Sequence, residues 1–343
     1  MKDARPTIAI TMGDPAGIGP EIAAKALARG EVYKTCRPLI VGDAEVMRQG
    51  MRIAGVRLCV RSIAQVEEAA FHENGMDVLD LKNVDVAHLE PGRVCASAGN
   101  AAFEAIEKVI ELALDKRVDA TVTGPIHKEA LNAAGHKYAG HTEIFAHRTR
   151  TRDYAMLLVY GDLRVIHVTT HIPLQQVSGS ITKARVLRVI ELASTACRTL
   201  GIRDPRIGVA GLNPHASDGG LFGREEQDQI ATAIEAARSA GIRVEGPLPP
   251  DTLFPQAMGG RFDVCVAMYH DQGHIPLKMV GFRWDRDRGR WESVNGVNIT
   301  LGLPIIRTSV DHGTAFDIAG KGIASPDSMI HAIEYATRLA HER

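Results

Sequence analysis

The sequence lacks the features of secreted, membrane-spanning and nucleic-acid-binding proteins. Its five cysteines are scattered without a Cys-x-x-Cys pair, which argues against a disulfide framework and favours a reducing compartment. No apolar run is long enough to cross a bilayer and no signal peptide is visible, so we expect a cytoplasmic protein without membrane contacts. A net charge of -1 gives no basic field for nucleic acid, and RRM, zinc-finger and helix-turn-helix patterns are absent.

The remaining signal is a regular alternation of apolar strands and amphipathic helices. The 343 residues exceed the usual size of one compact domain, and a hydrophobic fraction of 45% is ample for a core. In the first half, strand-like runs alternate with helical stretches such as Ala98–Lys116, which predicts a parallel sheet. Met156–Tyr160 and Leu163–Thr169 flank a two-residue turn and predict an antiparallel hairpin, so a mixed sheet is expected. The charged segment Trp284–Ser293 predicts a surface loop.

Three histidines stand at comparable places, each after an apolar strand. They are His171, His215 and His270, and the last opens the segment His270-Asp271-Gln272-Gly273-His274. In open α/β sheets, ligands bind beyond the carboxyl ends of strands. Three neutral imidazoles with one open position are typical of a catalytic divalent site, with zinc favoured by ligand type. The alternative is that each is a loop histidine making one hydrogen bond, but three at strand ends favour a metal.

Several residues suit an anionic ligand. Gly140-His141-Thr142-Glu143 predicts a loop entering a helix, whose free backbone N–H groups can bind a phosphate or carboxylate. His141 and Thr142 would add donors there, and a Thr142 N-cap is the alternative. Lys278, Asn298 and Arg307 flank apolar strands and suit an acid or phosphate, although each alone also fits a surface or capping role.

Two glycine-rich segments remain. Gly13–Gly19 lacks the Gly-x-Gly-x-x-Gly pattern and contains a proline, so a Rossmann fingerprint is not expected there. Asp311–Gly322 is rich in glycine and small residues, which would let a ligand approach the backbone closely. A structural turn is the alternative for the second segment.

Taken together, the chain resembles the 4-hydroxythreonine-4-phosphate dehydrogenase family along nearly its whole length. The matching motifs are Gly13–Glu21, Thr123–Lys128, Gly140–Glu143, Thr170–Leu174, Leu212–Ala216, Tyr269–Gly273 and Gly296–Pro304. In addition, His312–Gly322 resembles the cofactor loop of isocitrate and isopropylmalate dehydrogenases, which share the wider fold. The resemblance implies a two-domain α/β/α enzyme with mixed sheets, a cleft between domains and no Rossmann fingerprint.

The resemblance also implies a domain division and site residues. Residues 1–142 with 305–343 would form the first domain, holding both termini, and residues 143–304 the second, with the metal-ligand loops. The metal ligands would be His171, His215 and His270, and the substrate contacts His141, Thr142, Lys278, Asn298 and Arg307. The cofactor contacts would be Gly219, Gly220, His312 and Gly313. Asp251 and Asp271 are the catalytic candidates, with His274 as a further possible proton acceptor.

The implied reaction is an NAD- or NADP-dependent oxidation of a secondary alcohol β to a carboxylate, followed by loss of carbon dioxide. A divalent metal, zinc before magnesium or cobalt, would act in both steps, and the enzyme would be a homodimer with a shared active site. A phosphate acyltransferase of the same wider fold and a non-catalytic phospho-ligand sensor are the rival interpretations.

The sequence departs from the biosynthetic members, which act on 4-phosphooxy-L-threonine, in two places. His274 replaces a residue that is usually hydrophobic, and Arg283–Asn295 is an insertion. Both departures resemble a catabolic branch that acts on 4-phospho-D-threonate or 4-phospho-D-erythronate. A third branch oxidises dihydrodiol dicarboxylates from terephthalate and shares the variant Gly273-His274-Ile275-Pro276.

Overall fold

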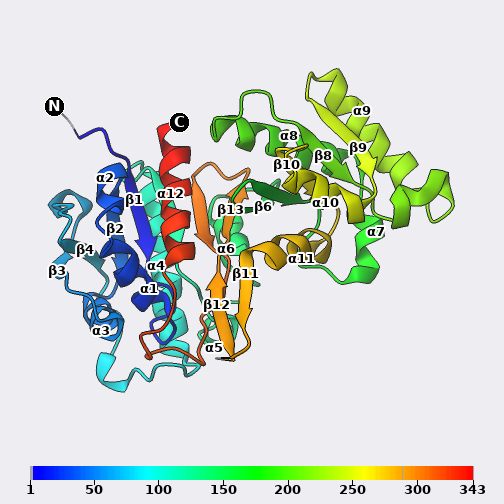
Figure 1. Ribbon diagram of the computed structural model, residues 1–343. Coiled ribbons are helices and arrows are strands. Elements are labelled where there is room, and N and C mark those ends of the chain that lie inside the picture. The colour runs from blue at the N-terminus through cyan, green and yellow to red at the C-terminus, as the bar shows by residue number, and fades with distance from the viewer. Residues whose placement is uncertain (1–2, 288, 343) are drawn as a thin grey trace. The chain divides into compact units, whose positions relative to one another are not determined.

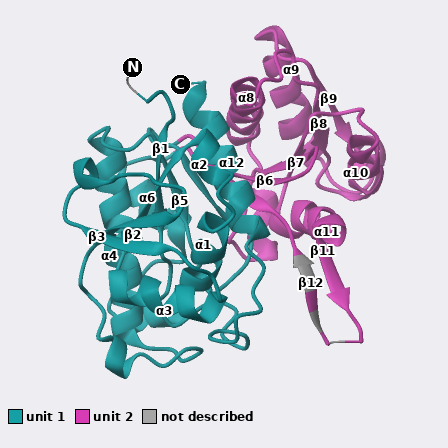
Figure 2. Ribbon diagram, turned by 60° about the vertical axis from the view of Figure 1, so that its left-hand side comes forward, with its two compact units in different colours: residues 1–152, 303–343 teal, residues 153–302 magenta. Residues whose placement is uncertain are grey.

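The computed structural model describes residues 3–287 and 289–342. The chain divides into two compact units (Figure 2): unit 1 contains residues 1–152 and 303–343, and unit 2 contains residues 153–302. Both termini therefore belong to unit 1. Among the described residues, no helix combines the length and the apolar character that crossing a membrane requires.

Unit 1 is built on six parallel strands with helices on both faces (Figure 1). In spatial order the strands are β3 (Cys59–Ile63), β4 (Gly75–Asp80), β2 (Arg37–Gly42), β1 (Thr7–Thr11), β5 (Ala120–Thr123) and β14 (Arg307–Val310). The helices are α1 (Gly19–Leu27), α2 (Val32–Thr35), α3 (Ala44–Ala54), α4 (Ala96–Leu114), α5 (Lys128–Ala133), α6 (His141–Arg148) and α12 (Asp327–His341). Single 3-10 turns lie at Val66–Glu68 and Val86–His88. The sequence-based domain boundary after residue 142 would fall inside α6, which lies wholly in unit 1.

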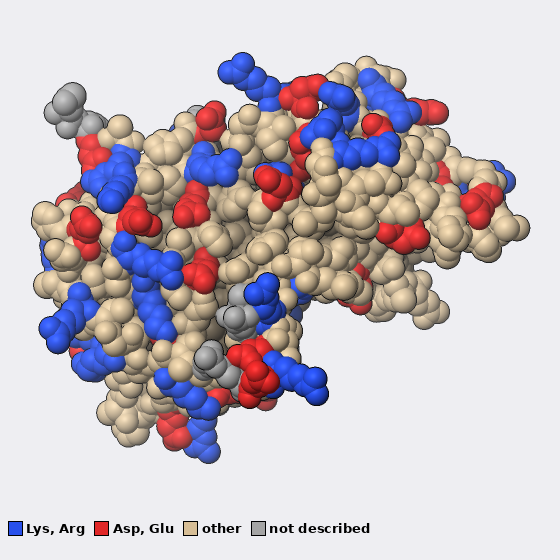
Figure 3. Space-filling model, in the orientation of Figure 1, with Lys and Arg blue, Asp and Glu red and all other residues tan. Residues whose placement is uncertain are grey.

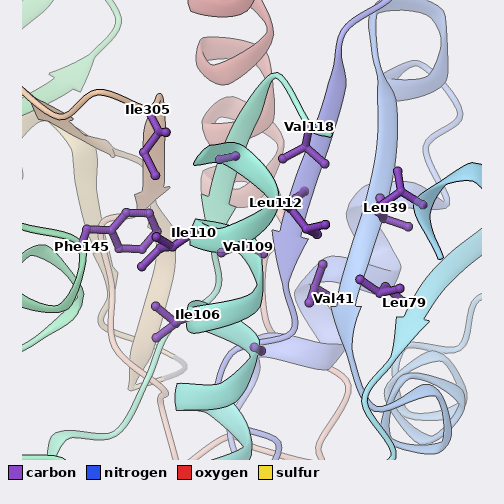
Figure 4. Close-up of a cluster of buried hydrophobic side chains, with 14 of the residues drawn as sticks. Leu39, Val41, Leu79, Ile106, Val109, Ile110, Leu112, Val118, Phe145 and Ile305 are labelled. Atoms are coloured by element: carbon purple, nitrogen blue, oxygen red, sulfur yellow. The ribbon is translucent and has the colours of Figure 1, made fainter. Parts of the chain in front are cut away.

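The core of unit 1 lies between α4 and the sheet (Figure 4). Ile106, Val109 and Ile110 recur three and four residues apart and form one apolar face of α4, against which Leu39 and Val41 of β2 pack. Because strand side chains alternate, residues 39 and 41 face α4 while Ile40 points to the other side of the sheet. These side chains are almost fully buried, and each contributes roughly 1.5–3 kcal/mol of hydrophobic free energy.

Unit 2 contains a mixed sheet, as the sequence predicts. In spatial order the strands are β13 (Val297–Leu301), β6 (Ala155–Tyr160), β7 (Leu163–His167), β10 (Val264–Ala267), β8 (Ile207–Ala210) and β9 (Val244–Leu248). The β13–β6 and β6–β7 pairs are antiparallel and the others are parallel. The helices are α7 (Val177–Ser180), α8 (Lys183–Thr199), α9 (Ala231–Ser239), α10 (Pro250–Met258) and α11 (His270–Gly281). Shorter turns are η3 (Leu174–Gln176), η4 (Pro214–Gly220) and the π-helical η5 (Glu226–Ile230).

The charged segment predicted as a surface loop is instead a β-hairpin. β11 (Phe282–Asp285) and β12 (Arg290–Val294) pair antiparallel, and Trp284 lies opposite Trp291. Their rings pack edge to face with 5.2 Å between centroids, a cross-strand aromatic pair of the kind that stabilises two-stranded ribbons. The loop prediction was wrong because it rested on the charged residues of the segment, whereas the packing of the two tryptophans stabilises a hairpin. Arg288, which belongs to this segment, lies outside the described residues.

Candidate active site

The three candidate metal ligands follow three adjacent strands of unit 2. β10 pairs in parallel with β7 on one side and β8 on the other, so the carboxyl ends of these strands lie at one edge of the sheet. His171 follows β7, His215 lies in η4 after β8, and His270 opens α11 after β10. The topology thus places all three histidines at the edge where α/β sheets bind ligands.

Two of the three imidazoles lie close together. The ring centroids of His171 and His270 are 5.9 Å apart, a separation compatible with two imidazoles sharing one cation at about 2.0–2.1 Å from each nitrogen. His270 Nδ1 lies 2.6 Å from the Asp271 Oδ1 atom, so it donates to the carboxylate and leaves Nε2 as the ligand atom. This arrangement is typical of a metal-binding histidine.

His274 and His167 extend this group as neutral rings. His274 stacks on His270 with 3.6 Å between centroids, and its Nδ1 donates to the His270 carbonyl at 2.9 Å. Burial lowers the pKa of His274 to about 3, with a further contribution from the neighbouring imidazoles. Burial likewise lowers the pKa of His167 to about 4. Both rings are therefore uncharged at neutral pH and add no positive charge that would repel a cation.

His215 is not grouped with the other two histidines. It lies exposed in the η4 turn, and over residues 3–287 and 289–342 no three His, Cys, Asp or Glu side chains are arranged to hold a metal ion. The donor chemistry fits a zinc-type cation, since three imidazoles come from adjacent strand ends and one is oriented by a carboxylate. The metal site itself stays a prediction.

In unit 1, a buried arginine lies beside the first turn of α6. Arg307, 2% exposed at the start of β14, donates from Nη2 to Thr123 Oγ1 at 2.8 Å and from Nη1 to Thr142 Oγ1 at 3.4 Å. The N-cap of α6 is Gly140 and not Thr142, so the N-cap alternative for Thr142 is wrong. The threonine hydroxyl instead accepts from the guanidinium, which places Arg307 at the first turn of α6.

The electrostatics of this group favour an anion. Burial lowers the pKa of Arg307 to about 10, with Glu143 partly opposing the shift, so the guanidinium stays charged at neutral pH. Burial and the Arg307 charge hold the pKa of His141 well below its usual value, so His141 is a neutral donor or acceptor. The Nε2 atom of His141 is buried and has no hydrogen-bond partner among the described residues. A polar ligand would satisfy it.

The other substrate candidates, Lys278 and Asn298, lie in unit 2. Lys278 is in the last turn of α11, with Nζ 5.0 Å from the centroid of the Phe282 ring. Asn298 is on β13, and its Oδ1 atom is buried without a hydrogen-bond partner in the described part of the chain. Among the catalytic candidates, Asp271 contacts His270, whereas Asp251 is exposed in the first turn of α10.

A pocket of about 600 Å³ lies between α11 and the hairpin of unit 2. Its lining includes His270, His274 and Lys278 of α11 and Phe282, Trp284 and Trp291 of β11 and β12. The hairpin insertion and His274 therefore line the same cavity as a candidate metal ligand and a candidate substrate lysine.

The candidate cofactor residues lie in two separate turns. Gly219 and Gly220 are in and directly after the left-handed part of η4, with φ of 72° and 104°. His312 and Gly313 follow β14 in unit 1, where the loop is held against the first glycine-rich turn by Ile18 N donating to Thr314 O at 3.1 Å. No contact in the structure tests a cofactor at either turn, and these assignments stay predictions.

Three polar residues that form hydrogen bonds around the candidate site were not predicted from the sequence. Thr123, which accepts from Arg307, ends β5 within a motif already singled out, so its place at a strand end was an available signal. Gln272, within the motif after β10, and Glu226, in η5, are both buried and hydrogen-bonded. Nothing in the local sequence pattern marks Glu226.

A family model described as "Pyridoxal phosphate biosynthetic protein PdxA" matches residues 34–336. The chain belongs to this family. The D-threonate 4-phosphate dehydrogenase of Cupriavidus necator is 49% identical, with 100% of both chains covered. A crystal structure of a 4-hydroxythreonine-4-phosphate dehydrogenase from Klebsiella pneumoniae is 48% identical, with a TM-score of 0.84 over 98% of this chain and 99% of that one. The family resemblance expected from the motifs is thus confirmed.

More distant structures share the fold. A terephthalate 1,2-cis-dihydrodiol dehydrogenase from Burkholderia xenovorans is 33% identical, with a TM-score of 0.66 over 97% of this chain and 98% of that one. At 16% identity and a TM-score of 0.50, a beta-decarboxylating dehydrogenase from Thermococcus kodakarensis is similar in fold alone, over 96% of this chain and 83% of that one. The predicted fold class is confirmed.

Proposed function

We propose that the protein is an NAD-dependent dehydrogenase that oxidises the secondary hydroxyl of a 4-phosphorylated 3-hydroxy acid. Full-length relatives named as dehydrogenases of D-threonate 4-phosphate and of 4-hydroxythreonine 4-phosphate support this class. D-threonate 4-phosphate or D-erythronate 4-phosphate is favoured over 4-phosphooxy-L-threonine, because His274 and the Arg283–Asn295 insertion depart from the biosynthetic members.

The observation that carries the proposal is the buried guanidinium of Arg307 beside the α6 N-terminus. The guanidinium lies at the first turn of α6 beside His141, whose buried Nε2 atom has no hydrogen-bond partner in the described part of the chain, and this group of polar atoms matches a phosphate or carboxylate. His141 and Thr142 would contact the same anionic group. Lys278 and Asn298 stay predicted contacts to the substrate.

A divalent cation is part of the proposal, held by His171, His215 and His270, with zinc preferred to magnesium or cobalt. When bound, such a cation supplies a Lewis acid that polarises the hydroxyl oxygen of the substrate. The role of Asp271 is to fix the His270 ring through the 2.6 Å bond to Nδ1. Asp251, Asp271 and His274 remain the candidates for accepting the hydroxyl proton.

The chemistry of the substrate supplies the second step. Oxidation of a hydroxyl β to a carboxylate, with hydride transfer to the nicotinamide, gives a β-keto acid that can lose carbon dioxide. Gly219, Gly220, His312 and Gly313 are the predicted contacts of NAD, with NADP as the alternative. A homodimer with a shared active site completes the proposal.

The test is a substrate panel. Purified protein with zinc and either NAD or NADP is given D-threonate 4-phosphate, D-erythronate 4-phosphate, 4-phosphooxy-L-threonine or a terephthalate-derived dihydrodiol, and NADH or NADPH and carbon dioxide are measured. We expect NADH and carbon dioxide with the first two acids. Reduced cofactor from the dihydrodiol alone would instead assign the activity of the Burkholderia xenovorans relative, which shares the fold and 33% of the sequence. Absence of reduced cofactor with every substrate, together with acyl transfer to phosphate, would assign a phosphate acyltransferase.

A further inference from the structure

The turn that carries His215 has an unusual backbone. Residues 215–219 have successive φ values from 42° to 75°, and four of the five are not glycine. L-amino acids enter this left-handed region as single residues, because Cβ approaches the following carbonyl. Such a run persists only where surrounding contacts determine it, and strained segments of this kind gather at functional sites.

A buried carboxylate holds the start of this turn. Glu226 is 2% exposed, and its Oε1 atom accepts from the backbone N–H groups of Leu212 and Asn213, both at 2.7 Å. Its Oε2 atom accepts from Asn213 Nδ2 at 2.9 Å. A carboxylate with three charge-assisted hydrogen bonds fixes two successive peptide units, and thereby the direction in which the chain enters residues 214–220.

Two further side chains hold the rest of the turn, one within it and one in η5. Ser217, fully buried, donates from Oγ to the Gly223 carbonyl at 2.6 Å. Gln227, one position after Glu226, donates from Nε2 to the Gly219 carbonyl at 2.7 Å. Glu226 and Gln227 belong to η5, a single π-helical turn, and π-helical turns are frequent at functional sites. The left-handed run is therefore fixed at its entry, its middle and its end.

The same turn is tied to the strand end that carries His270. Gln272 donates from Nε2 to the Gly211 carbonyl at 2.8 Å and accepts at Oε1 from Met268 N at 2.6 Å. Because Gly211 follows β8 and Met268 follows β10, one buried amide sets the spacing between the two strand ends. This amide therefore fixes the position of the chain just before the His215 turn relative to the strand end that precedes His270.

We propose that Glu226 is a positioning residue, which holds the left-handed turn so that His215 is presented as a metal ligand. This inference rests on the proposed function, in which His215 binds a divalent cation. Glu226 itself does not reach the metal. Its buried carboxylate fixes the entry of the turn, and Ser217 and Gln272 support the same geometry.

The chain offers a matched control. Glu225, the adjacent residue, also accepts from Asn213 Nδ2, at 3.0 Å, but it receives no backbone N–H group of the turn. The variants Glu226→Gln and Glu225→Gln therefore remove one negative charge from neighbouring carboxylates, and only the first disturbs the entry of the turn. In Glu226→Gln the new NH₂ group must face either the two backbone N–H groups or the Asn213 amide donor, so at least one donor at the entry of the turn loses its acceptor.

The experiment titrates metal-free full-length protein with Zn²⁺ by calorimetry and with Co²⁺ by visible absorption, under conditions where each variant has the circular dichroism of the wild type. We expect Glu226→Gln to weaken both metals about 10- to 100-fold, the usual effect of removing a group that orients a ligand, and to change the Co²⁺ absorption bands. Glu225→Gln should match the wild type in affinity and in spectrum.

The outcomes separate the inference from the proposed function. If the wild type binds neither metal, or if His215→Ala binds both as tightly as the wild type, the proposed metal site is wrong. If His215→Ala loses the metal but Glu226→Gln keeps wild-type affinity and spectrum, the positioning role is wrong and the site stands. If Glu226→Gln does not fold, Ser217→Ala decides. It removes only the bond to Gly223, and unchanged metal affinity in that variant overturns the inference.

Discussion

The substitution Arg307→Met separates a substrate-binding role for the buried guanidinium from a structural one. Arg307 is 2% exposed and has two threonine hydroxyls as acceptors, while burial lowers its pKa to about 10 despite the nearby Glu143. Replacing a whole buried ion pair by apolar side chains is often neutral or stabilising, whereas removing one partner costs about 3–5 kcal/mol because the other charge is left buried. Because Glu143 lies near the guanidinium, we expect Arg307→Met to lower the free energy of unfolding by up to about 3–5 kcal/mol, so the substrate-binding role is decided by the affinity for phosphate.

The affinity for a phosphorylated substrate should fall in the same variant. Truncating one partner of a buried, hydrogen-bonded charge pair costs about 2–5 kcal/mol, which at about 1.4 kcal/mol per tenfold corresponds to roughly 30- to 4,000-fold. The KM for the acid and the inhibition constant of inorganic phosphate should both rise within this range. Arg307→Lys keeps the charge but loses the planar fork, so we expect an intermediate loss.

The assay pairs initial rates of NADH formation with urea unfolding. Arg164 supplies the control, since it is also a buried arginine but donates to the carbonyls of Asp162 and Asp263 in unit 2, at 2.9 and 3.2 Å. Arg164→Met should lose stability and keep its KM. If Arg307→Met behaves in the same way, with lower stability and unchanged phosphate inhibition, the guanidinium is structural and the proposed anion site is refuted.

Three further predictions concern buried groups of unit 1. Burial raises the pKa of Asp14 to about 6, so the wild type loses stability as the pH rises through 6; Asp14→Asn should be more stable by up to about 3 kcal/mol near pH 8 and equal near pH 4 in urea unfolding. Burial lowers the pKa of His141, so this residue should make wild-type stability fall by up to about 1.4 kcal/mol per pH unit below about pH 6.5; His141→Asn should have a slope smaller by that amount, while the buried His167 and His274 keep their contributions. Leu112→Ala, at a fully buried position, should cost about 2–5 kcal/mol in urea unfolding, whereas Leu114→Ala, at a position 45% exposed, should stay within about 0.5 kcal/mol.

Elements with one dominant periodicity and a clear cap could be predicted from the sequence. α3 (Ala44–Ala54) and α8 (Lys183–Thr199) are such elements, because Asp43 and Thr182 cap their first turns with side-chain hydrogen bonds. The hairpin formed by β11 and β12 could not be predicted in the same way, because its charged residues are typical of a loop. The contact between Trp284 and Trp291, which pairs its two strands, is a tertiary feature.

Only part of the candidate site could be predicted from the sequence. The strand-end rule places His171 and His270 near each other, and the structure brings their rings within 5.9 Å. The contact between Arg307 and Thr142 spans 165 residues of sequence, and only the family motifs suggested a shared role for the two. The left-handed turn around His215 was not predictable, because its φ values depend on hydrogen bonds from Glu226 and Gln227, which lie outside the turn, as well as on Ser217.

The two sequence departures from the biosynthetic members meet in one cavity, which bears on the choice of substrate. His274 and the hairpin residues Trp284 and Trp291 line the pocket of about 600 Å³ that also contains Lys278. His274 stacks on His270, a candidate metal ligand. Phe282, the residue before the insertion, lies 5.0 Å from Lys278 Nζ and packs edge-on against the inserted Trp291 with 5.7 Å between centroids, so the second departure reaches the candidate substrate lysine through Phe282. Because a cation over an aromatic face is held in place, the hairpin constrains where the lysine charge lies. Discrimination between phosphorylated acids of the same length depends on where the lysine charge lies relative to the carboxylate and the hydroxyl of the substrate. We therefore expect the inserted hairpin to be the region in which this chain differs from a biosynthetic relative in substrate preference.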